Sequence, residues 1–310
     1  MQFDGFLFFL IVICAGYFSV KSKLVPESAT DVLPSVLLNV CFPAMLFINF
    51  ADTDIQELIG YGIPTVIATL VFSLLPFFVS LLLLRKVDER RRPILRYLSG
   101  VGNNSFVCIP LLSLFLTKSE MSIVFIHGAV MDFLIWGVHH QIFLGSTGGS
   151  RRAIVKKVLL TPNLIATVAG VLCSVFAVQL PGFLRYTLEG VAAAVSPIAL
   201  LFIGMLICRY GLFGWLKSKA AILYSLWKVL ALPCIVFGVL YFILPFKTAC
   251  ILAILLGSPA PITAVLWSKQ YGKDTKLAVD CLIPSTVLYF VVEGSILVLL
   301  LKYGVIGVLC

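Results

Sequence analysis

Two polar, proline-containing stretches interrupt apolar segments of this sequence. In the first, residues 99–110, two carboxamides and a hydroxyl (Asn103, Asn104 and Ser105) come shortly before Pro110. Proline has no backbone N–H, and its ring clashes with the carbonyl four residues earlier, so it kinks or breaks a helix. The stretch therefore predicts an interrupted helix with hydrogen-bonding side chains at the interruption, which is chemistry suited to binding a polar solute.

The second stretch, residues 257–263, carries the same kinds of groups. Pro259 and Pro261 stand two positions apart and are flanked by the hydroxyls of Ser258 and Thr263. Two prolines at this spacing do not fit in an unbroken helix. We expect a second interruption here.

The surrounding sequence is that of a membrane protein. Of its 310 residues 61% are hydrophobic and 12% charged, with a mean hydropathy of +1.10, whereas soluble domains are about 45–50% apolar and about 25% charged. A spanning helix needs about 20 apolar residues. No period-2 pattern suggests a β-barrel. Ten ranges are long and apolar enough to be spanning helices: 3–20, 32–50, 59–84, 94–116, 121–144, 162–180, 187–208, 220–243, 247–268 and 277–301.

The net charge of +9 is distributed unevenly and indicates topology, not binding of nucleic acid. Basic residues gather in the connections after the first, third, fifth, seventh and ninth ranges, within 21–23, 85–96, 151–157, 209–219 and 269–276. The other connections hold only Lys118, Arg185, Lys247 and Lys302. Because basic loops stay in the cytoplasm, we expect both termini outside the cell membrane. The start MQFDGFLFFL has no basic region before its apolar run and is predicted to be the first span, not a signal peptide.

The chain divides into two halves of five spans, which must then be inverted relative to each other, as in many transporters. A shift of 154 positions aligns Pro43 with Pro197, brings ICAG (13–16) onto TVAG (167–170), and lays GNNSFVCIP (102–110) on LGSPAPITA (256–264). We predict a first repeat over 1–144, a cytoplasmic linker over 145–161 and a second repeat over 162–310. The two interrupted spans are then the fourth and the ninth.

Three ionisable residues lie deep within predicted spans. Asp132, Lys228 and Glu293 each cost about 2.5–3.5 kcal/mol at mid-helix, so partners or water are expected. Their similar expected depth in the membrane favours an ion pair between Lys228 and Asp132. Such residues either balance the charge of a solute or a coupling ion during transport, or they form a fixed pair with a structural role. Asn39, in the second span, either lines the same cavity or bonds to a neighbouring helix.

At these motifs the sequence resembles the auxin efflux carrier family of membrane transporters, particularly bacterial members labelled malate or malonate permeases. NNSFVCIPLL (103–112) is similar to the family's fourth-span pattern, SPAPITAVLWSKQYGKD (258–274) to its ninth-span pattern, and LPSVLLNVCFPAMLF (33–47) to its second span. Ala264 and Gln270 depart from the pattern of plant members, which puts auxin itself in doubt as the substrate.

The resemblance implies an all-α fold of ten spans in two inverted repeats, whose broken fourth and ninth helices cross. It also implies an elevator-type motion. Together with the residues, it predicts secondary transport of a small organic anion, a carboxylate such as malate or malonate or an auxin-like acid, bound by Asn103, Asn104, Ser105, Pro110, Ser258, Pro259, Pro261, Thr263 and Asn39.

A transporter is not the only function compatible with these features. A membrane sensor or channel of the same fold stays open, whereas an intramembrane enzyme is disfavoured because protease motifs and clustered carboxylates are missing. The nine cysteines and three histidines show no metal-ligand spacing. We expect no metal or cofactor. Membrane lipid is an expected contact, and coupling to H⁺ or Na⁺ and assembly as a homodimer are left open.

Overall fold

The computed structural model describes residues 2–52, 55–144 and 160–306, and all regular structure within them is helical. No strand occurs in these ranges, so the prediction of an all-α protein is confirmed. Most of the predicted linker, with Arg151, Arg152, Lys156 and Lys157, lies outside the described residues.

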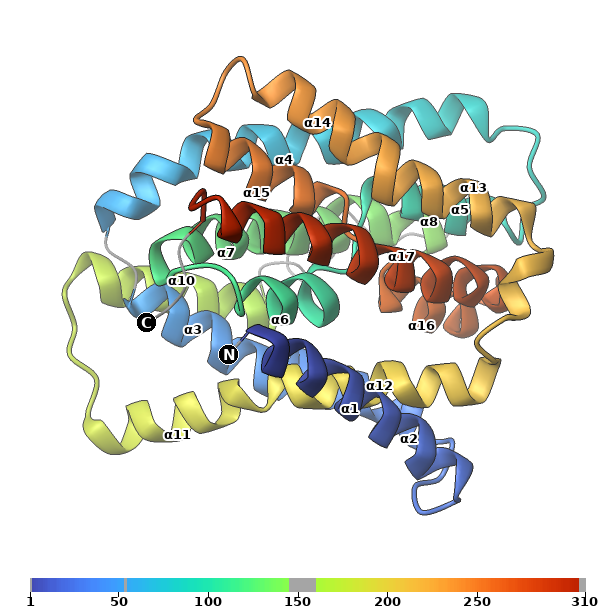
Figure 1. Ribbon diagram of the computed structural model, residues 1–310, viewed down its shortest axis with the longest axis horizontal. Coiled ribbons are helices and arrows are strands. Elements are labelled where there is room, and N and C mark those ends of the chain that lie inside the picture. The colour runs from blue at the N-terminus through green and yellow to red at the C-terminus, as the bar shows by residue number, and fades with distance from the viewer. Residues whose placement is uncertain (1, 53–54, 145–159, 307–310) are drawn as a thin grey trace.

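The helices run roughly along the long axis of Figure 1. In chain order they are α1 (Gln2–Lys21), α2 (Ala29–Val36), α3 (Phe42–Asp52), α4 (Ile55–Leu83), α5 (Arg92–Gly100), α6 (Ile109–Leu112), α7 (Lys118–Leu134), α8 (His140–Leu144), α10 (Pro162–Val175), α11 (Gly182–Ala193), α12 (Val195–Tyr210), α13 (Lys219–Leu226), α14 (Leu232–Leu240), α15 (Phe246–Leu256), α16 (Ile262–Gln270) and α17 (Thr275–Lys302). Turns of π-helix lie at Leu37–Cys41, Asn104–Cys108, Ile135–His139 and Trp227–Ala231, and a 3₁₀ turn at Gly214–Lys217.

Six continuous helical stretches of the described chain are long and apolar enough to cross a membrane: Ala29–Asp52, Gly60–Leu83, Ser119–Phe143, Gly182–Tyr210, Lys219–Leu240 and Thr275–Lys302. Three more apolar helices are shorter: Leu7–Lys21, Pro162–Val175 and Phe246–Leu256. The predicted fourth and ninth spans are each divided between two helices, α5 with α6 and α15 with α16. A multi-pass membrane protein is thus supported, while the count of ten spans stays a prediction.

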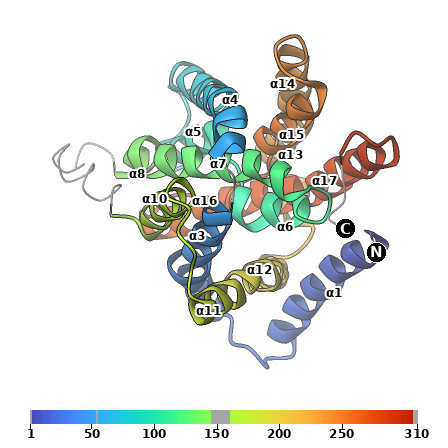
Figure 2. The same ribbon diagram turned by 90° about the vertical axis from the view of Figure 1, so that its left-hand side faces the viewer.

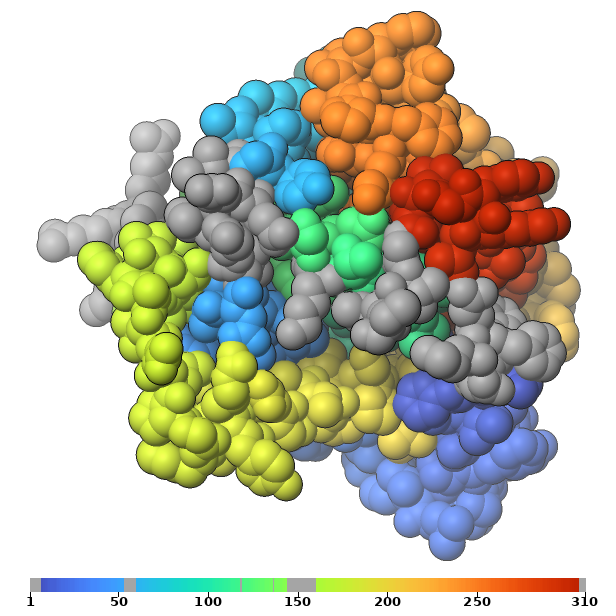
Figure 3. All heavy atoms as spheres, turned by 60° about the vertical axis from the view of Figure 1, so that its left-hand side comes forward, coloured from blue at the N-terminus to red at the C-terminus, as the bar shows by residue number. Residues whose placement is uncertain are grey.

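The helices pack as two groups that alternate along the chain. The first helix group consists of α1–α3 and α10–α12, in which α1 packs along α12, α3 packs along α10 and α11, and α2 packs against α12. In the second helix group, formed by α4–α8 and α13–α17, the closest packing is of α4 on α7, α13 on α17 and α14 on α15. Figure 2 shows α1, α3, α11 and α12 on one side and α4, α14 and α15 on the other. Figure 3 shows the same division on the surface. The first helix group (blue and yellow-green) lies below, and helices of the second group, α4 (cyan), α14 and α15 (orange) and α17 (red), lie above.

Glycines allow the closest contacts within the first helix group. A Cβ added to Gly16 of α1 would lie 2.1 Å from the carbonyl oxygen of Leu201 in α12. A Cβ added to Gly170 of α10 would lie 2.6 Å from the carbonyl oxygen of Phe47 in α3. In both contacts the backbone of a helix from one half of the chain touches a helix from the other half.

Basic connections from different parts of the chain meet at one end of the molecule. Asp31, which follows the first connection, bonds to Arg209 and to Lys269. Arg91 forms an ion pair with Asp274, whose backbone N–H donates to the carbonyl of Arg90 at 3.1 Å. The connections 22–28, 84–91 and 211–218 lie toward the right of Figure 1. The described part of the chain therefore has one basic end, as the charge pattern predicts.

Candidate functional site

The two interrupted segments are in direct contact. After α5 ends at Gly100, residues 101–103 leave the helical conformation, and residues 258–261 do so between α15 and α16. The backbone N–H of Asn103 donates to the carbonyl oxygen of Pro259 at 2.8 Å. A Cβ added to Gly102 would lie 1.7 Å from Oγ of Ser258. Because residue 102 has no side chain, the two interrupted segments can touch.

Local chemistry explains where each helix begins again. Asn103 Oδ1 accepts a hydrogen bond from the N–H of Phe106 at 3.3 Å, which caps the helical segment that starts at Asn104. Pro261 immediately precedes α16, at a position where a missing N–H costs little. Both helical segments therefore begin at the contact, and the first N–H groups of a helix have no partner within it.

α17 holds the second interruption in position. The hydroxyl of Ser285 accepts from the N–H of Ala260 at 3.0 Å, and the hydroxyl of Tyr289 donates to the carbonyl of Ile254 at 3.2 Å. Tyr289 in turn accepts from the thiol of Cys108 at 3.0 Å. These bonds replace part of the helical bonding lost at the break, which buried backbone in a membrane requires.

A cavity of about 250 Å³ opens beside the contact, between the two helix groups. The first group contributes the π-turn before α3, α3 itself and the start of α10, and the second contributes α7, the segment 102–109 and the start of α16. Its polar lining residues are Asn39, Asn103, Asn104, Ser105, Asp132, Thr161, Asn163 and Thr263. Most of the remaining lining is apolar and includes Phe42, Phe106 and Phe125.

Several carboxamides at this cavity have unused hydrogen-bonding capacity. Asn103, Asn104 and Asn163 are 2%, 5% and 6% exposed. Within the described residues, Asn103 Nδ2, Asn104 Oδ1 and Asn163 Oδ1 have no hydrogen-bond partner. Buried polar groups are nearly always bonded to protein or water, so three such atoms at one cavity indicate that a solute or water completes the wall.

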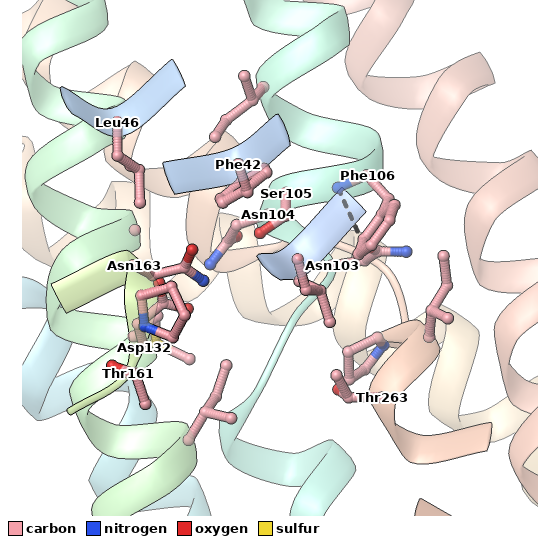
Figure 4. Close-up of a pocket in the computed structure, with 18 of the residues that line it drawn as sticks. Phe42, Leu46, Asn103, Asn104, Ser105, Phe106, Asp132, Thr161, Asn163 and Thr263 are labelled. Carbon is pink, nitrogen blue, oxygen red and sulfur yellow. Dashed lines mark hydrogen bonds between the residues drawn. The ribbon is translucent and has the colours of Figure 1, made fainter. Parts of the chain in front are cut away.

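The structure brings together most of the residues that the sequence predicts for the site. Asn39, Asn103, Asn104, Ser105, Pro261 and Thr263 line the cavity, as does Asp132. Figure 4 shows Asn104, Asn163 and Asp132 near one another, with Thr263 on the opposite side. Thr263 also shares a hydrogen bond of 2.6 Å with the hydroxyl of Tyr97, which fixes α16 to α5.

Three predicted residues do not line the cavity. Ser258 and Pro259 lie behind it, where they form the contact with Gly102 and Asn103. Pro110 is buried in the short helix α6. Ser258 and Pro259 shape the second interruption, whereas Pro110 lies in a helical segment that continues from Asn104 to Leu112 and does not break it. Contact of these three residues with a solute stays a prediction.

The expected pair of Lys228 and Asp132 is not formed. Asp132 lines the cavity, whereas Lys228 lies in the π-turn Trp227–Ala231 and does not. The ion pairs among the described residues join neither of them to the other. Similar depth along two helices does not determine which way each side chain faces. Glu293, 1% exposed on α17, also lies away from the cavity, and its Oε1 has no partner in the described chain.

Sequence reasoning missed Asn163 and Thr161. Both line the cavity from the start of α10, at the edge of a predicted span that is mostly apolar. The signal was present, since Asn163 follows Pro162 and is polar inside the predicted range 162–180. Nothing in the sequence, however, indicates that this end of α10 faces Asp132.

The sequence itself has relatives of known class. A family model described as "Membrane transport protein" matches residues 4–153. The resemblance to auxin efflux carrier-like transporters is thus confirmed. An uncharacterized transporter of Methanocaldococcus jannaschii is 22% identical over 211 residues, which cover 65% of this chain and 68% of that protein. Both similarities point to a membrane transporter.

Proposed function

We propose that this membrane transporter moves a small organic anion by secondary transport, and that the solute binds in the cavity between the two helix groups. One observation carries the proposal: two interrupted helices touch at Asn103 and Pro259, and the helical segments that follow both begin at the cavity. Helix N-termini carry partial positive charge and free N–H groups, which favour anions. The side-chain amides of Asn103, Asn104 and Asn163 add hydrogen-bonding groups at the same wall.

The lining favours a solute with one carboxylate and an apolar body. Asp132 is the one charged group among the described lining residues, and no basic side chain accompanies it. A second carboxylate, as in malate or malonate, would find no basic side chain among the described lining residues to balance its charge, because a single H⁺ or Na⁺ at Asp132 neutralises only Asp132 itself. Phe42, Phe106 and Phe125 offer apolar surface instead. We therefore favour a monocarboxylic acid over a dicarboxylate.

Asp132 also suggests how transport is coupled to an ion. Two carboxylates in one cavity are stable together only when a proton or a cation neutralises one of them. We propose that H⁺ or Na⁺ enters with the substrate and is held at Asp132. This role does not require Lys228, which lies outside the cavity lining.

The two helix groups supply the elements of an elevator motion. Each group contains helices from both halves of the chain, and the cavity lies on the boundary between the groups. The backbone contacts at Gly16 and Gly170, which the shift of 154 positions aligns, are what two inverted repeats would produce. We propose that the second helix group, which holds both interruptions, slides against the first and carries the solute across.

We further propose that the basic end faces the cytoplasm of the cell, with both termini outside, because basic connections are retained inside. Reporter fusions test the orientation. A green fluorescent protein inserted after Glu89 would stay in the cytoplasm and should fluoresce. One fused to the C-terminus should not fluoresce, because it would cross the membrane unfolded. The opposite result would invert the assignment.

Counterflow in proteoliposomes tests the function. Vesicles loaded with an unlabelled acid should accumulate the same labelled acid against its gradient, with saturation, which a channel or sensor does not do. Monocarboxylic acids with apolar bodies and dicarboxylic acids are compared, under H⁺ or Na⁺ gradients. Absence of counterflow for every acid would reject the proposal, and a preference for dicarboxylates would reject the proposed substrate class.

Replacing Asn104 by alanine tests the site. A hydrogen bond to a charged group contributes about 1.5–3 kcal/mol, so KM for the transported acid should rise roughly 10- to 100-fold with little change in protein stability. Asn49→Ala is the matched control, because Asn49 lies on α3 outside the cavity lining. Equal KM values for wild type and Asn104→Ala would move the binding site elsewhere.

A further inference from the structure

A second pocket lies at the basic end of the molecule and shares no lining residue with the cavity. It has a volume of about 690 Å³ and is open to the surroundings. Its walls come from the connection between α12 and α13, from the first turns of α17, and from Arg91. The connection passes from the first helix group to the second (Figure 1).

The pocket carries surplus positive charge. Its two carboxylates already have partners: Asp274 bonds to Arg91 and caps α17, and Asp280 bonds to Lys276 at 2.8 Å. Lys217 and Lys219 also line the pocket, and neither has a carboxylate partner in the described chain. Two positive charges are therefore left for a ligand to balance.

Apolar side chains of the same connection are exposed beside these lysines. Phe213 is 67% exposed, Leu216 is 55% exposed, and Leu223 on the following helix is 68% exposed. The connection joins the ends of two apolar helical stretches, Gly182–Tyr210 and Lys219–Leu240, so it lies where a membrane meets water. Basic groups adjoining exposed apolar groups at this level match the two parts of a phospholipid.

We infer that this pocket binds the headgroup of an anionic phospholipid. The phosphate contacts Lys217 and Lys219, and an acyl chain lies along Phe213 and Leu216. A soluble phosphate compound would use the lysines but not the apolar side chains, and a zwitterionic lipid would not balance the surplus charge. The site is independent of the substrate and of the cavity between the helix groups.

Spin-labelled lipids measure the binding directly. The transporter is reconstituted in phosphatidylcholine vesicles, and the fraction of motionally restricted label is compared for phosphatidylglycerol and phosphatidylcholine. The wild type should prefer phosphatidylglycerol. Lys217→Gln with Lys219→Gln should lower that preference by roughly fivefold for each lysine removed, as expected for basic groups near an anionic surface.

Matched variants separate the pocket from general attraction to basic residues. Lys21→Gln with Lys86→Gln removes the same charge at the same end, outside the pocket, and should keep most of the preference. Phe213→Ser with Leu216→Ser should lower retention of the lipid. Phe242→Ser with Ile243→Ser, which replaces residues that lie outside the connection and are even more exposed, should not. Thermal stability in phosphatidylcholine alone checks that each variant is folded.

Three results would overturn the inference. The first is an equal loss of preference in the two lysine double variants, which would indicate non-specific attraction. The second is unchanged preference after removal of Lys217 and Lys219. The third is full competition by soluble glycerol 3-phosphate, which would identify a site for a free anion instead of a lipid.

Discussion

At the scale of single residues, the contact between the two interruptions depends on Gly102. The space that its side chain would occupy is already filled by Ser258, with Oγ 1.7 Å from an added Cβ and the carbonyl oxygen 3.1 Å away. The neighbouring bond from Asn103 to Pro259 holds the two backbones at this separation. The two helices are interrupted at these segments, and the two interrupted segments can come into contact because Gly102 has no side chain.

Gly102→Ala should therefore impair transport and lower thermal stability, by about 1–3 kcal/mol as for other overpacked sites. Ser258→Gly in the same chain removes the Oγ that an added Cβ would strike and should restore part of both properties. Transport rate and melting temperature are measured for both variants. If the double variant were no better than Gly102→Ala alone, the contact with Ser258 would not be the cause.

At the scale of helices, α1 and α10 make similar close contacts with helices of the other half of the chain. Each is a short apolar helix that presents a glycine to the backbone of a helix from the other half, Gly16 to α12 and Gly170 to α3. In membranes, helices associate through small residues that let backbones approach closely. The first helix group is thereby joined across the two halves, although the connecting residues 145–159 are outside the described chain.

Gly170→Ala should destabilise this packing, because its Cβ would lie 2.6 Å from a carbonyl oxygen that belongs to another helix. Gly190→Ala on α11 is the control, since no atom lies within 4 Å of the added Cβ. There alanine should instead stabilise the helix, by up to about 1 kcal/mol. Melting temperatures in detergent compare the two, and the same sign of change in both would contradict the packing argument.

At the scale of the whole molecule, one described ion pair connects the two helix groups. Lys269, at the end of α16 in the second group, bonds to both oxygens of Asp31 of α2 in the first, at 2.9 Å each. Arg209 of α12 holds Asp31 from within the first group at 3.2 Å. Lys269 belongs to the segment SKQYGKD (268–274), which begins where the ninth predicted span ends. If the second group slides against the first, this pair must open.

Lys269→Gln should change the rate of substrate exchange by up to about fivefold, since exposed ion pairs contribute up to about 1 kcal/mol. Because high salt screens this ion pair, it should make the exchange rate of the wild type more like that of the variant. Arg185→Gln is the control: Arg185 and Asp52 form an ion pair inside the first group, which does not open in the proposed motion. Counterflow rates at low and high salt provide the measurement. Equal effects of the two substitutions would argue against a sliding boundary at Lys269.

The sequence by itself determined the class of protein, the helical fold and the places where helices break. These are properties of short segments: apolar length decides whether a segment enters the membrane, and a proline or glycine alters backbone bonding wherever it stands. The interruption at 258–261 falls at Pro259 and Pro261, and the one at 101–103 falls at Gly102. Pro110, which was expected to break the first helix, instead lies within the helical residues 104–112. The family resemblance rests on the same local motifs.

Only the tertiary structure decided which side chains meet. Asp132 faces Asn163 and the cavity, while Lys228, at similar predicted depth, faces elsewhere. The rotation of each helix about its axis, and the partner that it packs against, depend on contacts between residues far apart in the chain, such as Gly170 on Phe47 and Gly102 on Ser258. Segments of this chain that are nearly apolar all round carry little amphipathic signal to indicate which side faces a neighbour.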